Sequence, residues 1–178
     1  MICRTIDDVI NRLNTIVDEC KQQQDKLGYF AVLYRKVTIR VKQGIARNEF
    51  EDNQRMEKLD VLFANRYFEA YDAYRSKQTC SACWQVAFNA SRESGHIILQ
   101  HLLLGINAHI NLDLGMAALD TAGDQPLHSI QHDFNTINAI LSDMVDGVKA
   151  NIGKVSPVFK WLMPIADSLD SMDEMLVN

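Results

Sequence analysis

The stretch IILQHLLLGINAHINLDLGMAA, residues 97–118, decides the fold. It is too long for one strand and its residues are mostly apolar, so it predicts a helix from about residue 96 to residue 120, ended by Gly123. A helix that is apolar on all sides is normally buried among other helices. The stretch therefore predicts an all-α fold, a single-domain bundle of about six or seven helices around a buried central helix.

The rest of the chain is predicted to form helices that surround the central helix. Apolar residues recur at helical spacing in segments that we predict as helices at about 5–24, 29–46, 52–76, 81–91, from 126 onward and from 157 onward. Thr5 and Asp8 have the spacing of a capping box, Ser81 can cap the fourth helix, and Pro126 suits a first helical position. No repeat or linker divides the chain, which predicts one domain over residues 1–178.

The amino-acid composition indicates a globular protein and argues against a nucleic-acid binder. The chain is 47% hydrophobic and 23% charged, as in globular proteins, and its net charge of −5 argues against a nucleic-acid binder, which needs a basic face. The N-terminus has no secretory signal pattern. Imidazole, amide and carboxylate groups in the long apolar stretch are costly in hydrocarbon, so we expect no membrane span and a cytoplasmic location.

Familiar catalytic motifs are missing from the sequence. There is no HExxH, no GxSxG and no Gly-rich phosphate loop, and Glu-x-x-His occurs once, at Glu93 and His96, whereas a di-iron bundle needs two such pairs. Zinc proteases, α/β-hydrolases, P-loop enzymes and di-iron bundles depend on those residues. These classes are therefore excluded.

The polar side chains of the central helix form the candidate site. All five histidines lie between residues 96 and 132, and three of the central helix's polar residues are His101, His109 and Asp113. At about 100° per residue, Asp113 lies about 40° from His109 on one side and His101 about 80° on the other. Gly105, between the two histidines, leaves room for a ligand or a neighbouring backbone.

Two interpretations of this group stay open. His109 and Asp113 can be a catalytic base with its orienting carboxylate or, together with His101, ligands of a divalent metal. They can equally be a buried hydrogen-bonded pair that holds the helix in place. Because polar groups on a buried helix must find partners, either interpretation predicts polar contacts around them.

Further candidates lie on and after the third helix. Asp60 and Arg66 interrupt its apolar pattern beside Tyr67. We predict that these three residues and Asn111 of the central helix bind a ligand, with Arg66 anchoring an anion; alternatively, Asp60 and Arg66 simply pair with each other. His128 and His132 fall away from the apolar side of their helix, which predicts exposure to solvent. The Tyr-rich third helix can also face a second subunit, so a homo-oligomer is a further expectation.

Two stretches resemble a known family. FEDNQRMEKLDVLFANRY and LQHLLLGINAHINLDLG are similar to sequences of a mostly bacterial family of helical domains of unknown function, from about Tyr34 to the sixth helix. The resemblance implies the helical fold without supplying a mechanism. It also draws attention to a set of polar residues: Asp60, Arg66, His101, His109, Asn111 and Asp113.

A second resemblance rests on His109 and Asp113 alone. Their His-x-x-x-Asp spacing on a core helix is similar to that of the zinc-dependent phospholipase C and P1 nuclease group, although the Pro and His that follow that group's motif are missing here. We therefore predict a protein that binds or hydrolyses a small anionic ligand, with or without a divalent metal. The alternative is a non-enzymatic structural or interaction module in which the same residues form a buried hydrogen-bond network.

Overall fold

The computed structural model describes residues 2–140, which are helical apart from the connecting segments. The α-helices are α1 (Ile6–Gln23), α2 (Gly28–Ala46), α3 (Asn53–Arg75), α4 (Ala82–Ala90), α5 (Ile98–Ala108) and α6 (Gly115–Ala122). A π-helix, η1 (His109–Leu114), joins α5 directly to α6, and a 3-10 helix, η2 (Leu127–Ile130), precedes helical residues 131–140. No strand occurs between residues 2 and 140, and the predicted all-α fold is confirmed.

Local capping groups set where α1 and α3 begin. Thr5 Oγ1 accepts a hydrogen bond from the Asp8 amide at 3.1 Å, and Asp8 Oδ2 accepts one from the Thr5 amide at 3.0 Å, which confirms the capping box. Asp52 caps α3 by accepting from the Arg55 amide at 3.0 Å. Each cap satisfies amide groups that have no partner inside the helix.

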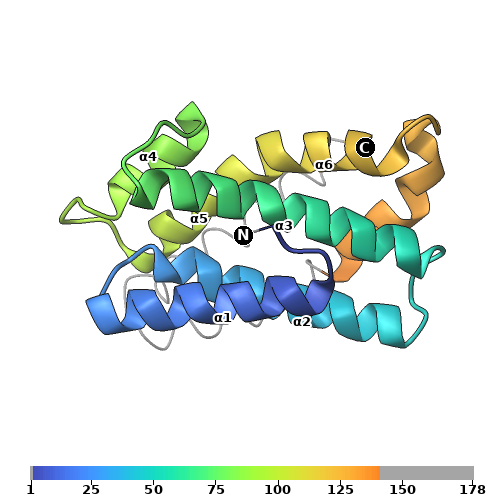
Figure 1. Cartoon of the computed structure of the whole chain (residues 1–178), viewed down its shortest axis with the longest axis horizontal. Coiled ribbons are helices and arrows are strands. Elements are labelled where there is room, and N and C mark those ends of the chain that lie inside the picture. The colour runs from blue at the N-terminus through green and yellow to red at the C-terminus, as the bar shows by residue number, and fades with distance from the viewer. Residues whose placement is uncertain (1, 141–178) are drawn as a thin grey trace, which may run out of the picture. The chain divides into compact units, whose positions relative to one another are not determined.

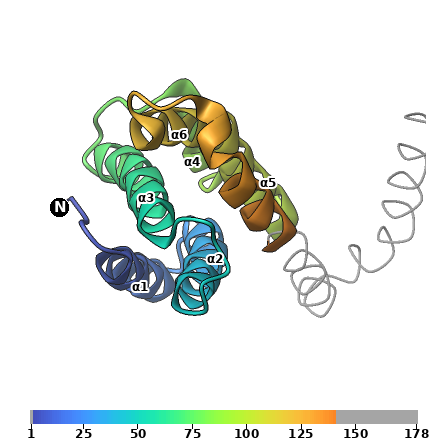
Figure 2. The same ribbon diagram turned by 90° about the vertical axis from the view of Figure 1, so that its right-hand side faces the viewer.

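The helices α5, η1 and α6 form one continuous segment, residues 98–122, which we call the rod (Figure 1). The helix α3 packs against α1 and α2 on one side and against η1 and α6 on the other. Figure 2 looks along the helices and shows α3 between α1 and α6. The rod also contacts α2 and α4 through α5.

Large aromatic side chains dominate the core between these helices. These side chains come from α2, α3 and α4. The buried face of α1 packs in the same core through Val9, Leu13, Ile16 and Cys20. The most completely buried large side chains are Trp84, Tyr67, Tyr71 and Phe68. Because aromatic rings each bury 150–250 Å² or so, this cluster supplies much of the apolar area that stabilises the fold.

Some predictions about the elements need correction or stay untested. The sixth helix begins after Pro126 as the 3-10 turn η2 rather than as an α-helix. Ser81 is the N-cap residue of α4 but makes no capping bond, and its Oγ instead lies 3.3 Å from Cys83 Sγ. The predicted helix from residue 157 lies outside the described residues, so the single domain over residues 1–178 stays a prediction.

Candidate functional site

The rod changes from α-helix to π-helix at His109–Leu114, the segment that carries His109 and Asp113. A π-helical turn is wider than an α-helical turn, is rare, and is often found at functional sites. Here it is flanked by regular α-helix on both sides. The π-helical backbone therefore contains His109 and Asp113, two of the residues that we predicted as a candidate site from the sequence.

Asp113 links two helices through hydrogen bonds to one of its oxygens. Its Oδ2 lies 3.0 Å from His109 Nδ1 and accepts a bond of 2.8 Å from the indole Nε1 of Trp84 in α4. All three side chains are buried. Because an indole N–H can only donate, Asp113 must accept from it, and the same oxygen is therefore placed to receive the Nδ1 proton of His109.

Aromatic rings from α2, α3 and α4 surround the His109 imidazole, which is 3% exposed. The ring of Phe63 stacks on it, with the centroids 3.5 Å apart and the planes 6° from parallel, and the ring of Tyr34 meets it at 4.6 Å and 69°. Three further rings have centroids within 6.1 Å of the imidazole: Phe30, Trp84 and Tyr67. This cage fixes the orientation of the imidazole and keeps bulk water away from it.

Burial keeps His109 neutral near neutral pH. It lowers the pKa of the imidazole, and the hydrogen bond and charge of Asp113 only partly oppose that effect. With Nδ1 directed at Asp113, the other nitrogen, Nε2, is the free acceptor. Nε2 is buried and has no hydrogen-bond partner among the described residues.

Two more unpaired polar atoms lie in the same core region. Tyr34 Oη and Asp60 Oδ2 are both buried without a hydrogen-bond partner in the described part of the chain. Burial, followed by the charges of Asp60 and Asp113, raises the pKa of Tyr34 well above its usual value. Burial and the charge of Glu57 raise the pKa of Asp60 to about 7.

The structure brings together only part of the predicted site. Asp60 and Tyr67 of α3 are buried in the core, Tyr67 within the aromatic cage of His109. Arg66 is half-buried and forms no ion pair with Asp60 in the described region, and its Nε has no partner. Asn111 lies on the exposed side of the rod, where its amide donates a 2.5 Å bond to Asn107 Oδ1, so the structure does not place it with His109.

His101 does not join His109 and Asp113. It is buried beside the rings of Tyr29 and His96, with centroids 5.8 and 5.7 Å away, and burial together with nearby Lys26 lowers its pKa. Between residues 2 and 140, no three His, Cys, Asp or Glu side chains come together in a way that could hold a metal ion. The predicted metal site of His101, His109 and Asp113 is therefore not assembled in that region.

Gly105 has a packing role instead of leaving room for a ligand. A β-carbon at this position would lie 2.5 Å from Cδ2 and 2.7 Å from Cγ of Phe30. The ring of Phe30 thus occupies the space that the sequence suggested for a ligand. Only glycine allows α5 to approach α2 this closely.

The histidines after the rod are exposed, as predicted, and the buried acid beside them is structural. His128 and His132 both face solvent. Asp133 is buried, pairs with Arg55 at 2.6 Å and accepts a 2.7 Å bond from the Glu51 amide. Asp133 therefore joins the segment after η2 to the start of α3.

Tyr34, Phe63 and Trp84 are the site residues that sequence reasoning missed. The spacing of apolar residues placed each of them on the inner face of its helix, but only as core. Trp84 was identifiable as a buried indole, which needs an acceptor for its N–H. Its acceptor is 29 residues away, at Asp113, and no local pattern reveals that pairing.

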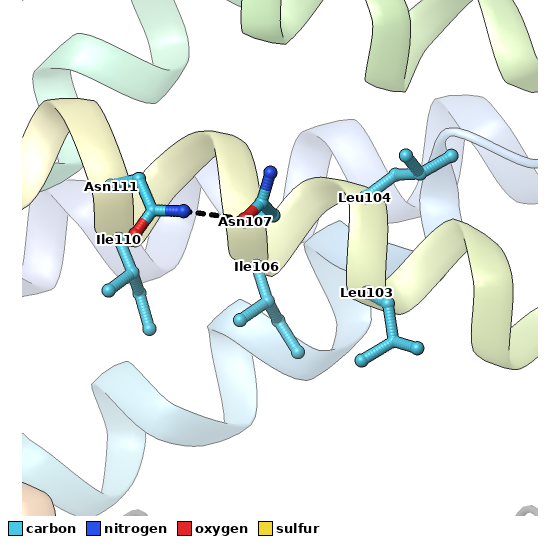
Figure 3. A pocket seen from close by; sticks show the side chains of 6 residues that line it. All are labelled: Leu103, Leu104, Ile106, Asn107, Ile110 and Asn111. Carbon is cyan, nitrogen blue, oxygen red and sulfur yellow. Dashed lines mark hydrogen bonds between the residues drawn. The ribbon is translucent and has the colours of Figure 1, made fainter.

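The rod exposes several large apolar side chains, which corrects the prediction of a helix buried all round. Five large apolar side chains of the rod are 42–54% exposed: Leu103, Ile110, Leu112, Met116 and Leu119. An open pocket of about 440 Å³ lies along the side of the rod that carries Leu103 and Ile110, and Figure 3 shows Leu103, Ile106 and Ile110 pointing the same way along it. The rod is therefore not buried all round, and apolar side chains lie on part of its exposed surface.

By length and composition, the rod is also the one helix in the described region that could cross a membrane. Its most apolar window has a mean hydropathy of 1.4 and is 39% buried inside the protein. Core helices of water-soluble proteins satisfy the same criteria. The absence of a membrane span and the cytoplasmic location therefore stay predictions.

Comparison with known proteins assigns the chain to a family. Residues 6–178 match the family described as "Family of unknown function (DUF5995)". The chain belongs to DUF5995. This confirms the resemblance to a family of unknown function, whereas nothing bears on the similarity to zinc-dependent phospholipases. No curated protein and no solved structure matches this DUF5995 chain.

Proposed function

We propose that this DUF5995 domain binds a small polar molecule in its interior, beside η1, and that His109 acts on the molecule as a base held in place by Asp113. One observation carries the proposal. Three buried polar atoms from three different helices, His109 Nε2, Tyr34 Oη and Asp60 Oδ2, lack partners in one region of the core. Together they offer a ligand acceptors and donors from several directions.

The energetic cost of these atoms favours binding over a purely structural network. A buried polar atom without a partner costs about 1–3 kcal/mol, so three of them cost several kcal/mol of a stability that is usually about 5–15 kcal/mol. A structural network would pair its members. Here Asp113 is hydrogen-bonded to both Trp84 and His109, but the second ring nitrogen of His109, Nε2, has no partner in the described region.

The charges of the site favour an uncharged or cationic ligand. The charges of Asp60 and Asp113 add to the effect of burial in raising the pKa of Tyr34, and no positive charge lowers it. The predicted anionic ligand is therefore not proposed for this site. A ligand with N–H or O–H donors suits His109 Nε2, which can only accept when Nδ1 carries the proton.

The chemistry open to these residues is proton transfer. His109 is neutral near pH 7 and so can accept a proton at Nε2, while Asp113 stabilises the imidazolium that forms. Asp60, with its pKa near 7, can donate or accept a proton in the same pH range. Because His109 is 3% exposed, the surrounding helices must part to admit a ligand.

The test combines thermal unfolding with variants that remove single unpaired atoms. Amines, amides and polyols of low molecular weight are screened for stabilisation of the full chain, with carboxylic and phosphoric acids as the anionic comparison. A binder at 100 times its Kd stabilises by about 2.7 kcal/mol. We expect stabilisation by an uncharged or cationic compound, and its loss in Asp60→Asn.

Tyr34→Phe separates this proposal from the structural alternative. Because Tyr34 Oη has no partner, its removal is expected to leave the free energy of unfolding unchanged or to raise it by up to about 1 kcal/mol, while weakening the compound found in the screen. Tyr71→Phe is the control, since the Tyr71 hydroxyl lies 3.7 Å from Cys20 Sγ. A loss of about 1 kcal/mol or more in Tyr34→Phe, with no compound bound by the wild type, would support a structural network instead.

The outer surface of the rod favours a second candidate, an interaction module that pairs with a second copy of this chain. The pocket on this side is lined by uncharged residues only: Leu103, Leu104, Ile106, Asn107, Ile110 and Asn111. The two asparagines bond to each other. A neutral apolar surface can contact its own copy about a two-fold axis without repulsion between like charges. Exposed patches of this kind commonly mark protein interfaces.

Molar mass measured by light scattering at increasing concentration tests this candidate. We expect a dimer in the wild type, and a monomer in Leu103→Glu/Ile110→Glu because two carboxylates would enter the apolar contact. Val86→Glu, at an exposed apolar position on α4, is the matched control and should remain dimeric. A wild type that stays monomeric at high concentration would exclude pairing through the rod.

A further inference from the structure

A second pocket, separate from the residues around His109, gathers positive charge in an acidic chain. It has a volume of about 340 Å³ and lies between the α1–α2 connection, the end of α3 and the turn after α4. Four cationic side chains and one acidic side chain line it: Lys26, Arg75, Lys77, Arg92 and Asp25. The lining carries a net charge of +3, whereas the whole chain carries −5.

Most of this positive charge is not neutralised. Arg75 pairs with Asp25 at 2.8 Å and also donates to Gln23 Oε1 at 2.6 Å, so it mainly fixes the walls of the pocket. No ion pair joins Lys26, Lys77 or Arg92 to a carboxylate in the part of the chain that the structure describes. Lys26 instead donates to the carbonyl of Glu93 at 2.8 Å.

The remaining contacts keep two cations available at the pocket. The Arg92 guanidinium lies over the ring of Tyr74, 4.9 Å from its centroid, which leaves the N–H groups at its edge free to donate. Lys77 is exposed and has a left-handed backbone, with φ at 57°. A residue with a β-carbon pays roughly 1 kcal/mol for that conformation, a cost that glycine at the end of α3 would avoid.

The helix ends at the pocket do not cancel its charge. The carboxyl ends of α1, α3 and α4 lie at Gln23, Arg75 and Ala90, and each contributes about half a negative charge, while the amino end of α2 at Gly28 contributes about half a positive charge. Together they offset about one of the three excess positive charges. The pocket therefore remains attractive to an anion, and its volume is at the lower end of the range of about 300–1,000 Å³ for small-molecule sites.

We infer that this pocket binds the phosphate group of a small organic molecule. Arg92 and Lys77 supply charged donors that form no ion pair in the described region, and Lys26 adds positive charge to the lining. The guanidinium of Arg92 stacks on the ring of Tyr74. Phosphate suits guanidinium and ammonium donors because it accepts several charge-assisted hydrogen bonds at once. The inference does not depend on the function proposed for His109.

Titration of the full chain with glycerol 3-phosphate, followed by NMR of the backbone amides at constant ionic strength, tests the inference. We expect saturable shifts at residues 23–27, 74–77 and 91–92. The double variant Lys77→Gln/Arg92→Gln should raise the Kd at least tenfold. Arg75 is left unchanged because it bridges Asp25 and Gln23.

Arg4→Gln/Lys36→Gln is the matched control, since it makes the same change in net charge at two exposed positions outside the pocket. Its Kd should stay within twofold of the wild type. An equal loss of affinity in both double variants would mean general electrostatic attraction and would overturn the inference. Binding of citrate without binding of glycerol 3-phosphate or inorganic phosphate would overturn the assignment to phosphate.

Discussion

Replacing Asp113 with alanine is expected to lower the free energy of unfolding by about 3–5 kcal/mol. The change removes the acceptor of the Trp84 indole N–H and the partner of His109 Nδ1, and both groups stay buried. A buried donor without a partner costs about 1–3 kcal/mol. Urea unfolding at pH 8, where His109 is neutral, measures the loss.

Asp120→Ala provides the comparison for this result. Asp120 is an exposed carboxylate on the same rod, and its removal should change stability by no more than about 0.5 kcal/mol. A loss below about 1 kcal/mol in Asp113→Ala would mean that the indole and imidazole find other partners. The link between α4 and the rod would then not depend on Asp113.

Asp60 is expected to make the protein less stable as the pH rises from 5 to 8. Its pKa is about 7 in the folded protein, against 3.8 for the ordinary carboxyl, so the folded state holds a proton that the unfolded state has already lost. The stabilising contribution is present below pH 3.8 and disappears as the pH passes 7. Over pH 5–8 the wild type should lose about 3 kcal/mol relative to Asp60→Asn.

Urea unfolding of both proteins at a series of pH values measures this difference. The lowered pKa of His109 acts in the opposite direction, because that stabilising contribution is lost as the pH falls below 6.5. Both proteins contain His109, so the comparison cancels its effect. Parallel stability curves for wild type and Asp60→Asn would show that Asp60 keeps an ordinary pKa.

Sequence reasoning succeeded where the cause of a structure is local. The capping box of Thr5 and Asp8 lies next to the helix that it begins, and apolar spacing marks the third helix, so α1 and α3 were predicted to within a residue or two. The hydrogen bond between His109 and Asp113 also joins residues four apart on one helix. Such features depend on spacing, which a single sequence contains.

The rest of the site depends on contacts between distant segments. The pairing of Trp84 with Asp113 and the stacking of Phe63 on His109 follow from how three helices pack, and apolar spacing only places such residues in the core. Phe30 fills the space beside Gly105 for the same reason. Apolar composition also could not separate a helix buried all round from one with an exposed apolar face.

The π-helical turn explains how one rod can bury both of its halves. In an uninterrupted α-helix, the buried positions before the turn and those after it would point in directions roughly 180° apart. These positions are residues 101, 102, 105, 108 and 109 in the first half, and residues 117, 118, 121 and 122 in the second.

Six residues wound at the wider π-helical pitch turn through roughly 100° less than they would in an α-helix, which removes more than half of that divergence. The second half of the rod is thereby rotated back toward α3, which it contacts through α6. A regular α-helix of the same sequence would have to leave Ala117 and Thr121, or else His101 and Gly105, facing water. The π-helical turn thus rotates the second half of the rod relative to the first. The buried residues of both halves can therefore pack into the same core.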